Sequence, residues 1–285
     1  IPVGYSVDGN KGVRDPRGLH GQSLGVNMHL VTAASGPIRN LEQGISRCHL
    51  NICGKVITPY ASALACVSQD EAKLGVTCID MGGGTTTISV FFDGELVYVE
   101  SIPVGGAHVT NDIARGLSTP FSHAERMKAL YGSAIPTPSD NNEIIKVPLI
   151  GEEETGETNQ VPRSVLIGII RPRIEETLEL VRDRLVAAGF DKVAGRRIVL
   201  TGGASQLSGA KEMSGIILEK QVRHGKPQAV SGLADSVSGP AFSTSVGLLH
   251  FAFNNPAKAE NNAYRPADVP NSRFARFGQW LRESF

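Results

Sequence analysis

The stretch Ile79–Thr86 reads Ile-Asp-Met-Gly-Gly-Gly-Thr-Thr, so that an apolar strand runs through a carboxylate into three glycines and two hydroxyls. Glycine has no Cβ, which lets consecutive backbone N–H groups approach an anion, and it adopts positive φ angles at little cost. We therefore predict a phosphate-binding hairpin whose glycines form a nest with positive φ, and in which Asp80 reaches Mg²⁺ through water. The alternative is an ordinary tight turn, because turns between strands also favour glycine.

The composition is that of a globular protein. The chain has 285 residues, of which 41% are hydrophobic, enough for one large or two ordinary domains. Lys and Arg together number 28, as do Asp and Glu, so no overall positive field predicts nucleic acid as a partner. We find no signal peptide and no run long enough for a transmembrane helix. Because Ile1 is not an initiator Met, we expect the chain to be part of a longer product.

The four cysteines lack the spacing of a zinc site or a redox pair. They lie in apolar or strand-like contexts, and we expect buried free thiols in a reducing cytosol. They are Cys48, Cys53, Cys66 and Cys78.

The first third of the chain alternates short strands and helices. Leu24–Thr32 has the period of a half-buried strand, and Arg39–Cys48 has helical spacing. Val56–Pro59 is interpreted as a strand that ends at proline. Tyr60–Ala65 is then a helix of small residues suited to close packing.

Three strands in succession surround the glycine stretch. They are predicted over Gly75–Met81, Thr85–Phe92 and Leu96–Val104, and a helix is predicted over Ala107–Leu117. A meander of strands leading into a helix is therefore expected here.

The pattern then changes in a way that indicates an inserted unit. His123–Tyr131 is predicted to be helical, Asn141–Ile150 a strand, and Gly151–Gln160 an acidic loop. A long amphipathic helix begins at Pro162. After it, Arg197–Leu200 has the character of a buried strand.

That strand ends in a second glycine turn, Thr201–Ser205, at the end of a strand where α/β sheets place their ligands. Between the two turns, Glu125 and Lys128 stand three residues apart on one helical face, so both can point at one ligand. The alternative for this pair is an exposed ion pair of small energetic value.

Together these segments resemble the FtsA family of bacterial cell-division proteins, within the superfamily of actin, Hsp70 and sugar kinases. Asp80–Thr86 resembles the second phosphate loop of that superfamily, and Val199–Ala204 resembles its adenosine loop. The other segments that carry the resemblance are Gly75–Asp80, Ile102–Gly106, Thr110–Ala114, Ala124–Lys128, Ser243–Leu249 and Trp280–Phe285. The resemblance implies an α/β, actin-like (ribonuclease H-like) ATPase fold with the FtsA-specific α+β subdomain, and a C-terminal amphipathic helix on a flexible tether.

The resemblance also implies a division into domains, with the first phosphate loop upstream of Ile1. Its parts are the latter part of the FtsA-specific subdomain (1–54), the returning part of the first large subdomain (55–74), the second large, nucleotide-binding subdomain (75–121 and 196–253), an inserted small subdomain (122–195), a linker (254–270) and a membrane-targeting helix (271–285).

The site that the resemblance implies binds ATP and Mg²⁺. Asp80 would reach Mg²⁺ through water. Phosphates, ribose and adenosine would be held by Gly82, Gly83, Gly84, Thr85, Glu125, Lys128, Gly202 and Gly203. Some filament-forming bacterial actins carry a glutamate where this chain has Thr58, and a hydroxyl is no comparable base. We therefore expect at most a slow ATPase, with nucleotide acting as an assembly ligand and no catalytic residue assigned.

The end of the chain has a separate chemistry. Asn254–Pro270 is rich in proline and polar residues, as in an extended tether. At about 100° per residue, the apolar side chains that follow fall within an arc of roughly 80°, with Trp at its edge and arginines beside it. This pattern predicts an interfacial helix on anionic lipid, although docking on the protein's own core or in a partner's groove are alternatives. Its predicted membrane-binding residues are Arg273, Phe274, Phe277, Trp280, Leu281, Arg282 and Phe285.

The resemblance implies that the protein polymerises at the cytoplasmic face of the inner membrane and anchors FtsZ filaments, the Z ring, at the division site. Its partners would be the FtsZ C-terminal peptide, further copies of itself, later division proteins and the anionic membrane surface. Arg173 is a candidate contact for the acidic peptide, with a solvated helix face as the alternative. The competing hypothesis is a soluble ATP-dependent enzyme of the same superfamily, a sugar kinase or a chaperone-type ATPase.

Overall fold

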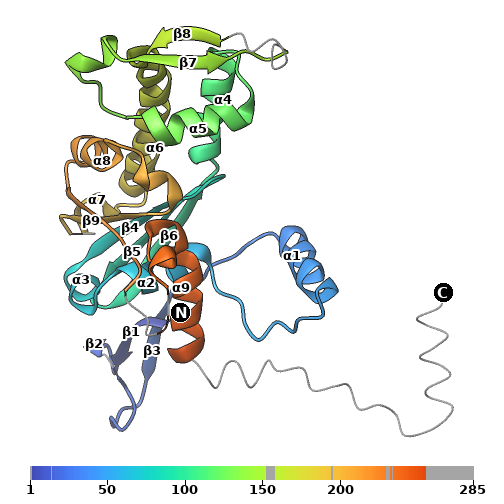
Figure 1. The fold of residues 1–285 in the computed structure, drawn as a ribbon. Coiled ribbons are helices and arrows are strands. Elements are labelled where there is room, and N and C mark those ends of the chain that lie inside the picture. Colours follow the sequence, from blue (N-terminus) through green and yellow to red (C-terminus); the bar gives the residue numbers. More distant parts are fainter. Residues whose placement is uncertain are drawn as a thin grey trace, which may run out of the picture. The chain divides into compact units, whose positions relative to one another are not determined.

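The computed structural model describes residues 2–13, 15–151, 158–193, 195–228, 232 and 234–254. By its internal contacts the chain forms two units, Ile1–Val31 with Ile57–Phe251 and Thr32–Val56 with Ala252–Phe285. The first unit contains all the described strands, and the second contains helix α1 (Ser35–Arg47) (Figure 1). Within the described ranges, no helix combines the length and the apolar character needed to cross a lipid bilayer.

A five-stranded mixed sheet is the centre of the first unit. In sheet order the strands are β10 (Gln221–His224), β9 (Arg197–Thr201), β4 (Val76–Met81), β5 (Thr86–Phe92) and β6 (Glu95–Ile102). The predicted meander is confirmed, because β4–β5 and β5–β6 pair antiparallel, while β9 joins β4, and β10 joins β9, in parallel. The parallel pairing brings the ends of β4 and β9 to the same edge, so the two glycine turns become neighbours.

Both faces of this sheet are covered, as the fully buried strand β4 requires. Successive side chains point to opposite faces, so Ile79 and Met81 pack into the larger apolar core while Val76 and Cys78 pack into the smaller one. The larger core includes α4 (Gly106–Gly116), α5 (Phe121–Tyr131), α6 (Arg163–Ala187) and α8 (Ala210–Leu218). The smaller core includes α2 (Thr58–Cys66) and α9 (Ser243–Asn254).

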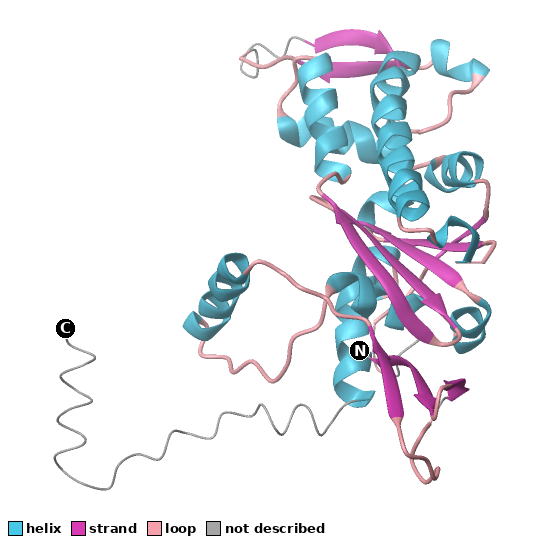
Figure 2. Ribbon diagram, turned by 180° about the vertical axis from the view of Figure 1, so that it is seen from behind, coloured by secondary structure: helices cyan, strands magenta, loops and turns pink. Residues whose placement is uncertain are grey.

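The long helix α6 confirms the predicted amphipathic segment. Leu166, Ile170, Ile174 and Leu178 are all at most 2% exposed, at the spacing of one helical face, and the helix continues through Pro172. Strands β7 (Ile144–Pro148) and β8 (Thr158–Pro162) form a short hairpin. Figure 2 shows this hairpin at the ends of the helices that lie away from the large sheet. A short helix, α7 (Phe190–Val193), and the strand β9 follow α6.

The predicted strand over Val56–Pro59 is wrong. Residues 51–57 have no helix or strand, and α2 begins at Thr58 with Pro59 in its first turn. Proline suits that position because an N–H group in the first turn of a helix has no hydrogen-bond partner within the helix, so its absence costs nothing. The close packing expected of the small residues is confirmed, because a Cβ on Gly247 of α9 would lie 1.7 Å from the carbonyl oxygen of Ala61.

A second, three-stranded antiparallel sheet lies at the start of the chain. Its order is β2 (Asn10–Val13), β1 (Pro2–Val7) and β3 (Leu24–Met28). The predicted strand at Leu24 is confirmed, but it ends earlier than expected and all its residues are exposed, so the expected half-burial is wrong. A capped helix, α3 (Gln69–Leu74), precedes β4 and was not predicted.

The prediction for the cysteines is half right. All four are free thiols, but only Cys66 and Cys78 are buried, whereas Cys48 and Cys53 are exposed. Helix α1, which precedes both exposed thiols, has no buried residue. The apolar residues near Cys48 and Cys53 in the sequence therefore do not form a core that buries these thiols.

Candidate functional site

The glycine loop connects β4 to β5 at the edge of the large sheet. Its backbone closes through a hydrogen bond of 2.9 Å from the Gly82 N–H to the Thr85 carbonyl oxygen. The first two amides of α4 hold the loop from the other side, because Gly106 donates to the Gly82 carbonyl (2.9 Å) and Ala107 to the Gly83 carbonyl (2.8 Å). The carbonyls of Gly82, Gly83 and Thr85 therefore all accept hydrogen bonds within the protein.

The predicted positive φ angles of this loop are absent. None of Gly82, Gly83 and Gly84 has a positive φ. The reason is that a short connection closed by its own backbone hydrogen bond needs no left-handed residue here. A Cβ at Gly83 or Gly84 would meet no protein atom within 4 Å, and both residues are exposed. The absence of side chains thus leaves open space over the loop.

Close approach of backbones is required at Gly105 instead. A Cβ there would lie 2.6 Å from the Gly82 oxygen and 2.7 Å from the Gly83 oxygen. Its φ of -157° is ordinary extended backbone, so contact alone demands glycine at this position. Gly105 therefore allows the start of α4 to support the glycine loop.

The second glycine turn packs directly against the end of β4. Gly202 has φ 89° and ψ 161°, a region that is essentially restricted to glycine. A Cβ there would lie 2.3 Å from Oδ1 of Asp80 and 2.4 Å from the Met81 carbonyl oxygen. Gly203 is more open, with only the Ala241 Cβ nearby at 3.8 Å.

The Asp80 carboxylate is 7% exposed and is held by hydroxyls from two helices. Ser62 of α2 donates to Oδ2, and Thr244 of α9 donates to the same oxygen over 3.2 Å. Among the described residues no hydrogen bond reaches Oδ1, and no group of three His, Cys, Asp or Glu side chains could hold a metal. A single carboxylate with one oxygen left open would suit a Mg²⁺ that keeps its waters and is bound through them.

Glu125 and Lys128 of α5 form a cluster with Thr110 of α4. Lys128 Nζ lies 2.7 Å from Glu125 Oε2, 2.8 Å from Thr110 Oγ1 and 3.0 Å from the Gly106 carbonyl oxygen. Partial burial raises the pKa of Glu125, but the hydrogen bonds from Lys128 and Thr110 outweigh burial and leave the pKa below its usual value. The carboxylate is thus kept charged near the glycine loop.

Gly106 lies close to the glycine loop, the second glycine turn and Lys128. A Cβ on it would lie 3.0 Å from the Ala204 Cβ, 3.7 Å from Lys128 Nζ and 3.7 Å from the Gly82 oxygen. The structure therefore brings the predicted phosphate, ribose and adenosine segments to one edge of the sheet.

Other predicted site residues lie apart from this cluster. Arg173 of α6 forms two hydrogen bonds with Asp112 of α4, of 2.6 and 3.1 Å, and also pairs with Glu176. Its role in partner binding stays a prediction. The predicted membrane helix, from Arg273 to Phe285, lies outside the described residues.

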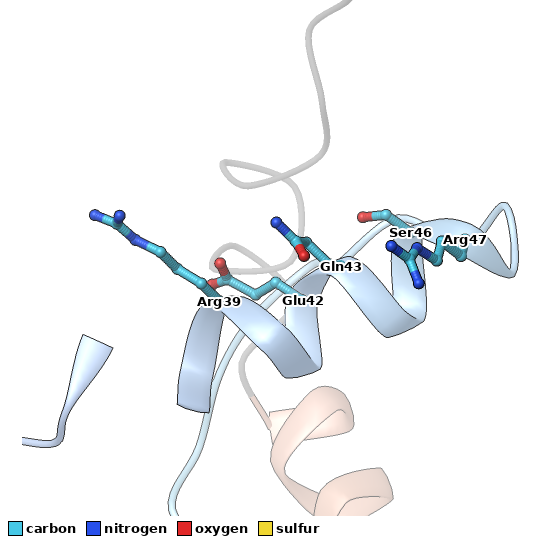
Figure 3. Close-up of a pocket in the computed structure, with 5 residues that line it drawn as sticks. All are labelled: Arg39, Glu42, Gln43, Ser46 and Arg47. Carbon is cyan, nitrogen blue, oxygen red and sulfur yellow. The ribbon is translucent and has the colours of Figure 1, made fainter. Parts of the chain in front are cut away.

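A shallow hollow lies along helix α1 in the second unit. Its described lining comes from that helix alone, as the side chains in Figure 3 show, and is formed by Arg39, Glu42, Gln43, Ser46 and Arg47. None of the predicted site residues lines it.

Comparison with known proteins supplies the family. The model named Cell division protein FtsA matches residues 77–247, which include both glycine turns and the cluster around Glu125. The chain belongs to the FtsA family. A second model, for the SHS2 domain inserted in FtsA, matches residues 1–32, where the three-stranded sheet lies.

Curated FtsA proteins match along the whole chain. Identity is 51% to the protein of Rhizobium meliloti (strain 1021), covering 100% of this chain and 65% of that protein. It is 38% to FtsA of Neisseria meningitidis serogroup B, covering 99% and 68%, and 33% to FtsA of Escherichia coli K12, covering 100% and 69%. The chain thus spans about 65% of the length of its more similar FtsA relatives.

Solved structures with a similar fold are actin-like proteins. MreB 5 of Spiroplasma citri bound to AMPPNP has a TM-score of 0.59 at 18% identity, covering 81% of this chain and 68% of that one. A chain of the PilM–PilN type IV pilus biogenesis complex has a TM-score of 0.56 at 17% identity, covering 80% and 58%. At these identities the likeness shows the fold alone, and the predicted actin-like α/β class is confirmed.

Four residues that support the candidate site do not follow from the sequence alone: Ser62, Gly105, Thr110 and Thr244. The paired glycines after β6 were a usable signal for Gly105, and Thr110 stands one helical turn after Gly106. No local pattern marks Ser62 or Thr244, because they meet Asp80 only through packing of α2 and α9 on the sheet.

Proposed function

We propose that this FtsA-family chain binds ATP with Mg²⁺ at the edge of the large sheet, polymerises, and anchors FtsZ filaments to the cytoplasmic face of the inner membrane through its C-terminal segment. The proposal places the protein at the division site as a peripheral membrane protein that helps to recruit later division proteins. Family membership favours this function over a soluble sugar kinase or chaperone-type ATPase.

The observation that carries the nucleotide proposal is the convergence on Gly106. This residue hydrogen-bonds to the glycine loop through its N–H group and to Lys128 through its carbonyl. Exposed glycines without neighbours leave room for phosphates, and backbone N–H groups together with Thr85 would hold them. Oδ1 of Asp80 would orient a water of the bound Mg²⁺.

A charge introduced into the loop tests nucleotide binding. Gly83→Asp places a carboxylate in the open space over the loop, where it would repel a triphosphate, so ATP affinity measured by calorimetry should fall at least about tenfold. Gly36→Asp is the matched control, because Gly36 of α1 is also open and has no positive φ. Unchanged ATP affinity in Gly83→Asp would sink the proposal for this loop.

The role of hydrolysis needs a separate experiment. Thr58, the first residue of α2, is exposed and offers a hydroxyl in place of a carboxylate base. If nucleotide is an assembly ligand, ATP and a non-hydrolysable analogue should support sedimentable filaments equally. Assembly that requires hydrolysis would contradict this reading.

Membrane attachment is proposed from the sequence of the tail. Full-length protein should float with anionic vesicles, and a variant that ends at Pro270 should not. Vesicles without anionic lipid serve as the control, since arginines flank the apolar arc. Equal flotation of both proteins would exclude the membrane role of this segment.

Arg173 is proposed to contact the FtsZ C-terminal peptide. The guanidinium of Arg173 is paired with the carboxylate of Asp112. Asp112→Asn removes the negative charge beside Arg173 and should therefore strengthen binding of an acidic peptide, while Arg173→Lys should weaken that binding. Fluorescence anisotropy of a labelled peptide measures both changes. If the two variants change affinity in the same direction, Arg173 acts through the fold and not through contact.

A further inference from the structure

The Thr110 hydroxyl lies at the centre of the cluster between α4 and α5, and the side chain is 0% exposed. Oγ1 is 2.5 Å from Glu125 Oε2, 3.1 Å from the Gly106 carbonyl oxygen and 2.8 Å from Lys128 Nζ. A hydroxyl has one proton to donate and can also accept. Thr110 therefore links the carboxylate to the ammonium and to the backbone that holds the glycine loop.

Lys128 has no free donor in this arrangement. An ammonium carries three N–H groups, and Lys128 directs them at Gly106, Thr110 and Glu125. Its side chain is 16% exposed, whereas that of Glu125 is 51% exposed. Lys128 thus supports its neighbours, and the ligand-facing group of the pair is Glu125.

The two oxygens of Glu125 have different roles. Oε2 accepts from both Thr110 and Lys128, while among the described residues no hydrogen bond reaches Oε1. A half-exposed carboxylate with one fixed oxygen and one open oxygen is an acceptor suited to neighbouring hydroxyls.

We propose that Thr110 is a positioning residue, which with Lys128 fixes Oε2 of Glu125 and so leaves Oε1 to accept the 2′- and 3′-hydroxyls of a ribose. The inference rests on the proposed nucleotide function and deepens it. The site then recognises a ribonucleotide through its sugar as well as its phosphates.

Sugar discrimination tests the inference directly. The ratio of the dissociation constants of 2′,3′-dideoxy-ATP and ATP is measured by calorimetry, because the two ligands share base and triphosphate. In the unmodified chain the ratio should be about ten or more, as expected for lost hydrogen bonds to a charged group. In Thr110→Val, which keeps the shape but lacks the hydroxyl, the ratio should fall to about one to three.

Two control variants separate positioning from general damage. Thr110→Ser retains the hydroxyl and should restore the ratio. Thr177→Val removes a matched hydroxyl, because Thr177 of α6 is also buried in a helix and its Oγ1 also lies within hydrogen-bond distance of the carbonyl oxygen four residues earlier, that of Arg173, at 2.8 Å. Its ratio should equal that of the unmodified chain.

A double variant shows whether Thr110 acts through Glu125. Glu125→Gln alone should lower the ratio, and adding Thr110→Val should lower it no further, since residues in one network are not additive. Should Thr110→Val fail to unfold cooperatively, Thr110→Ala provides the same comparison.

The inference would be overturned by an unchanged ratio in Thr110→Val, by an equal loss in Thr177→Val, or by additive effects of Thr110→Val and Glu125→Gln. A ratio of one in the unmodified chain would also overturn it while leaving nucleotide binding intact. Failure of the unmodified chain to bind ATP at all would instead overturn the proposed function.

Discussion

Arg223 on β10 holds the carboxylate of Glu71 in α3 through two hydrogen bonds, of 2.6 Å from Nε to Oε1 and 2.5 Å from Nη2 to Oε2. The same carboxylate accepts the Ser68 N–H over 3.0 Å and so caps α3, while Nη2 of Arg223 also donates to the Cys66 carbonyl over 2.8 Å. This one pair therefore ties the edge strand β10 to the end of α2 and the start of α3.

The first prediction is an acid-sensitive contribution to stability from Glu71. The hydrogen bonds from Arg223 are the main cause that lowers the pKa of Glu71 from 4.5 to about 2. Because the folded pKa lies below the unfolded one, the stabilisation is complete above pH 4.5 and is lost as pH falls towards 2. Glu71→Gln should lower the free energy of unfolding at pH 7 by about 1–3 kcal/mol, and by much less near pH 2.

Urea unfolding at several pH values measures this effect. The control is Glu175→Gln, which breaks the exposed pair of Arg171 and Glu175 and should cost less than about 1 kcal/mol. A loss in Glu71→Gln that is the same at all pH values would contradict the assignment.

The second prediction concerns the contact between Gly202 and Asp80. Gly202→Ala combines a backbone conformation that costs about 1–3 kcal/mol in non-glycine residues with a Cβ placed 2.3 Å from Oδ1 of Asp80. It should lower both the unfolding temperature and the ATP affinity. Gly18→Ala is the control, because Gly18 also has positive φ, of 83°, but no neighbour within 4 Å. Equal effects of the two variants would show that backbone strain alone matters.

The third prediction is that Gly105→Ala displaces the glycine loop without backbone strain, since its φ is extended. The new Cβ would push away the carbonyls of Gly82 and Gly83, so the amides of Gly106 and Ala107 should exchange hydrogen faster and ATP should bind at least about tenfold more weakly. Gly36→Ala is the control and should be neutral or slightly stabilising, because alanine favours a helix. Unchanged amide exchange in Gly105→Ala would contradict the contact.

The fourth prediction separates the metal from the nucleotide. Asp80→Asn removes the charge but keeps an oxygen for Ser62 and Thr244, so Mg²⁺ should no longer strengthen ATP binding while binding in the presence of a chelator stays similar. Thr244→Val retains the carboxylate and should keep the Mg²⁺ effect. A full Mg²⁺ effect in Asp80→Asn would show that Asp80 does not hold the proposed Mg²⁺.

Local patterns predicted the elements with strong periodicity. The meander β4–β6 and the long helix α6 follow from alternation and from helical spacing of apolar residues, and both are confirmed. The segment before α2 was misread because Val56 and Ile57 have strand character, while the proline that follows begins a helix. The edge strand β10 has a polar sequence, and only its pairing with β9 identifies it.

The sequence by itself determined the chemical groups of the candidate site: two glycine turns after strands, an acidic residue at the end of β4, and a Glu–Lys pair on a helix. Each of these signals lies within a few neighbouring residues, where backbone geometry and periodicity act directly. The tertiary structure alone decided how they work together. Asp80 meets Ser62, 18 residues away, and Thr244, 164 residues away, and Thr110 reaches Glu125 from another helix. Such contacts depend on how helices pack on both faces of a sheet, and no local propensity encodes that packing.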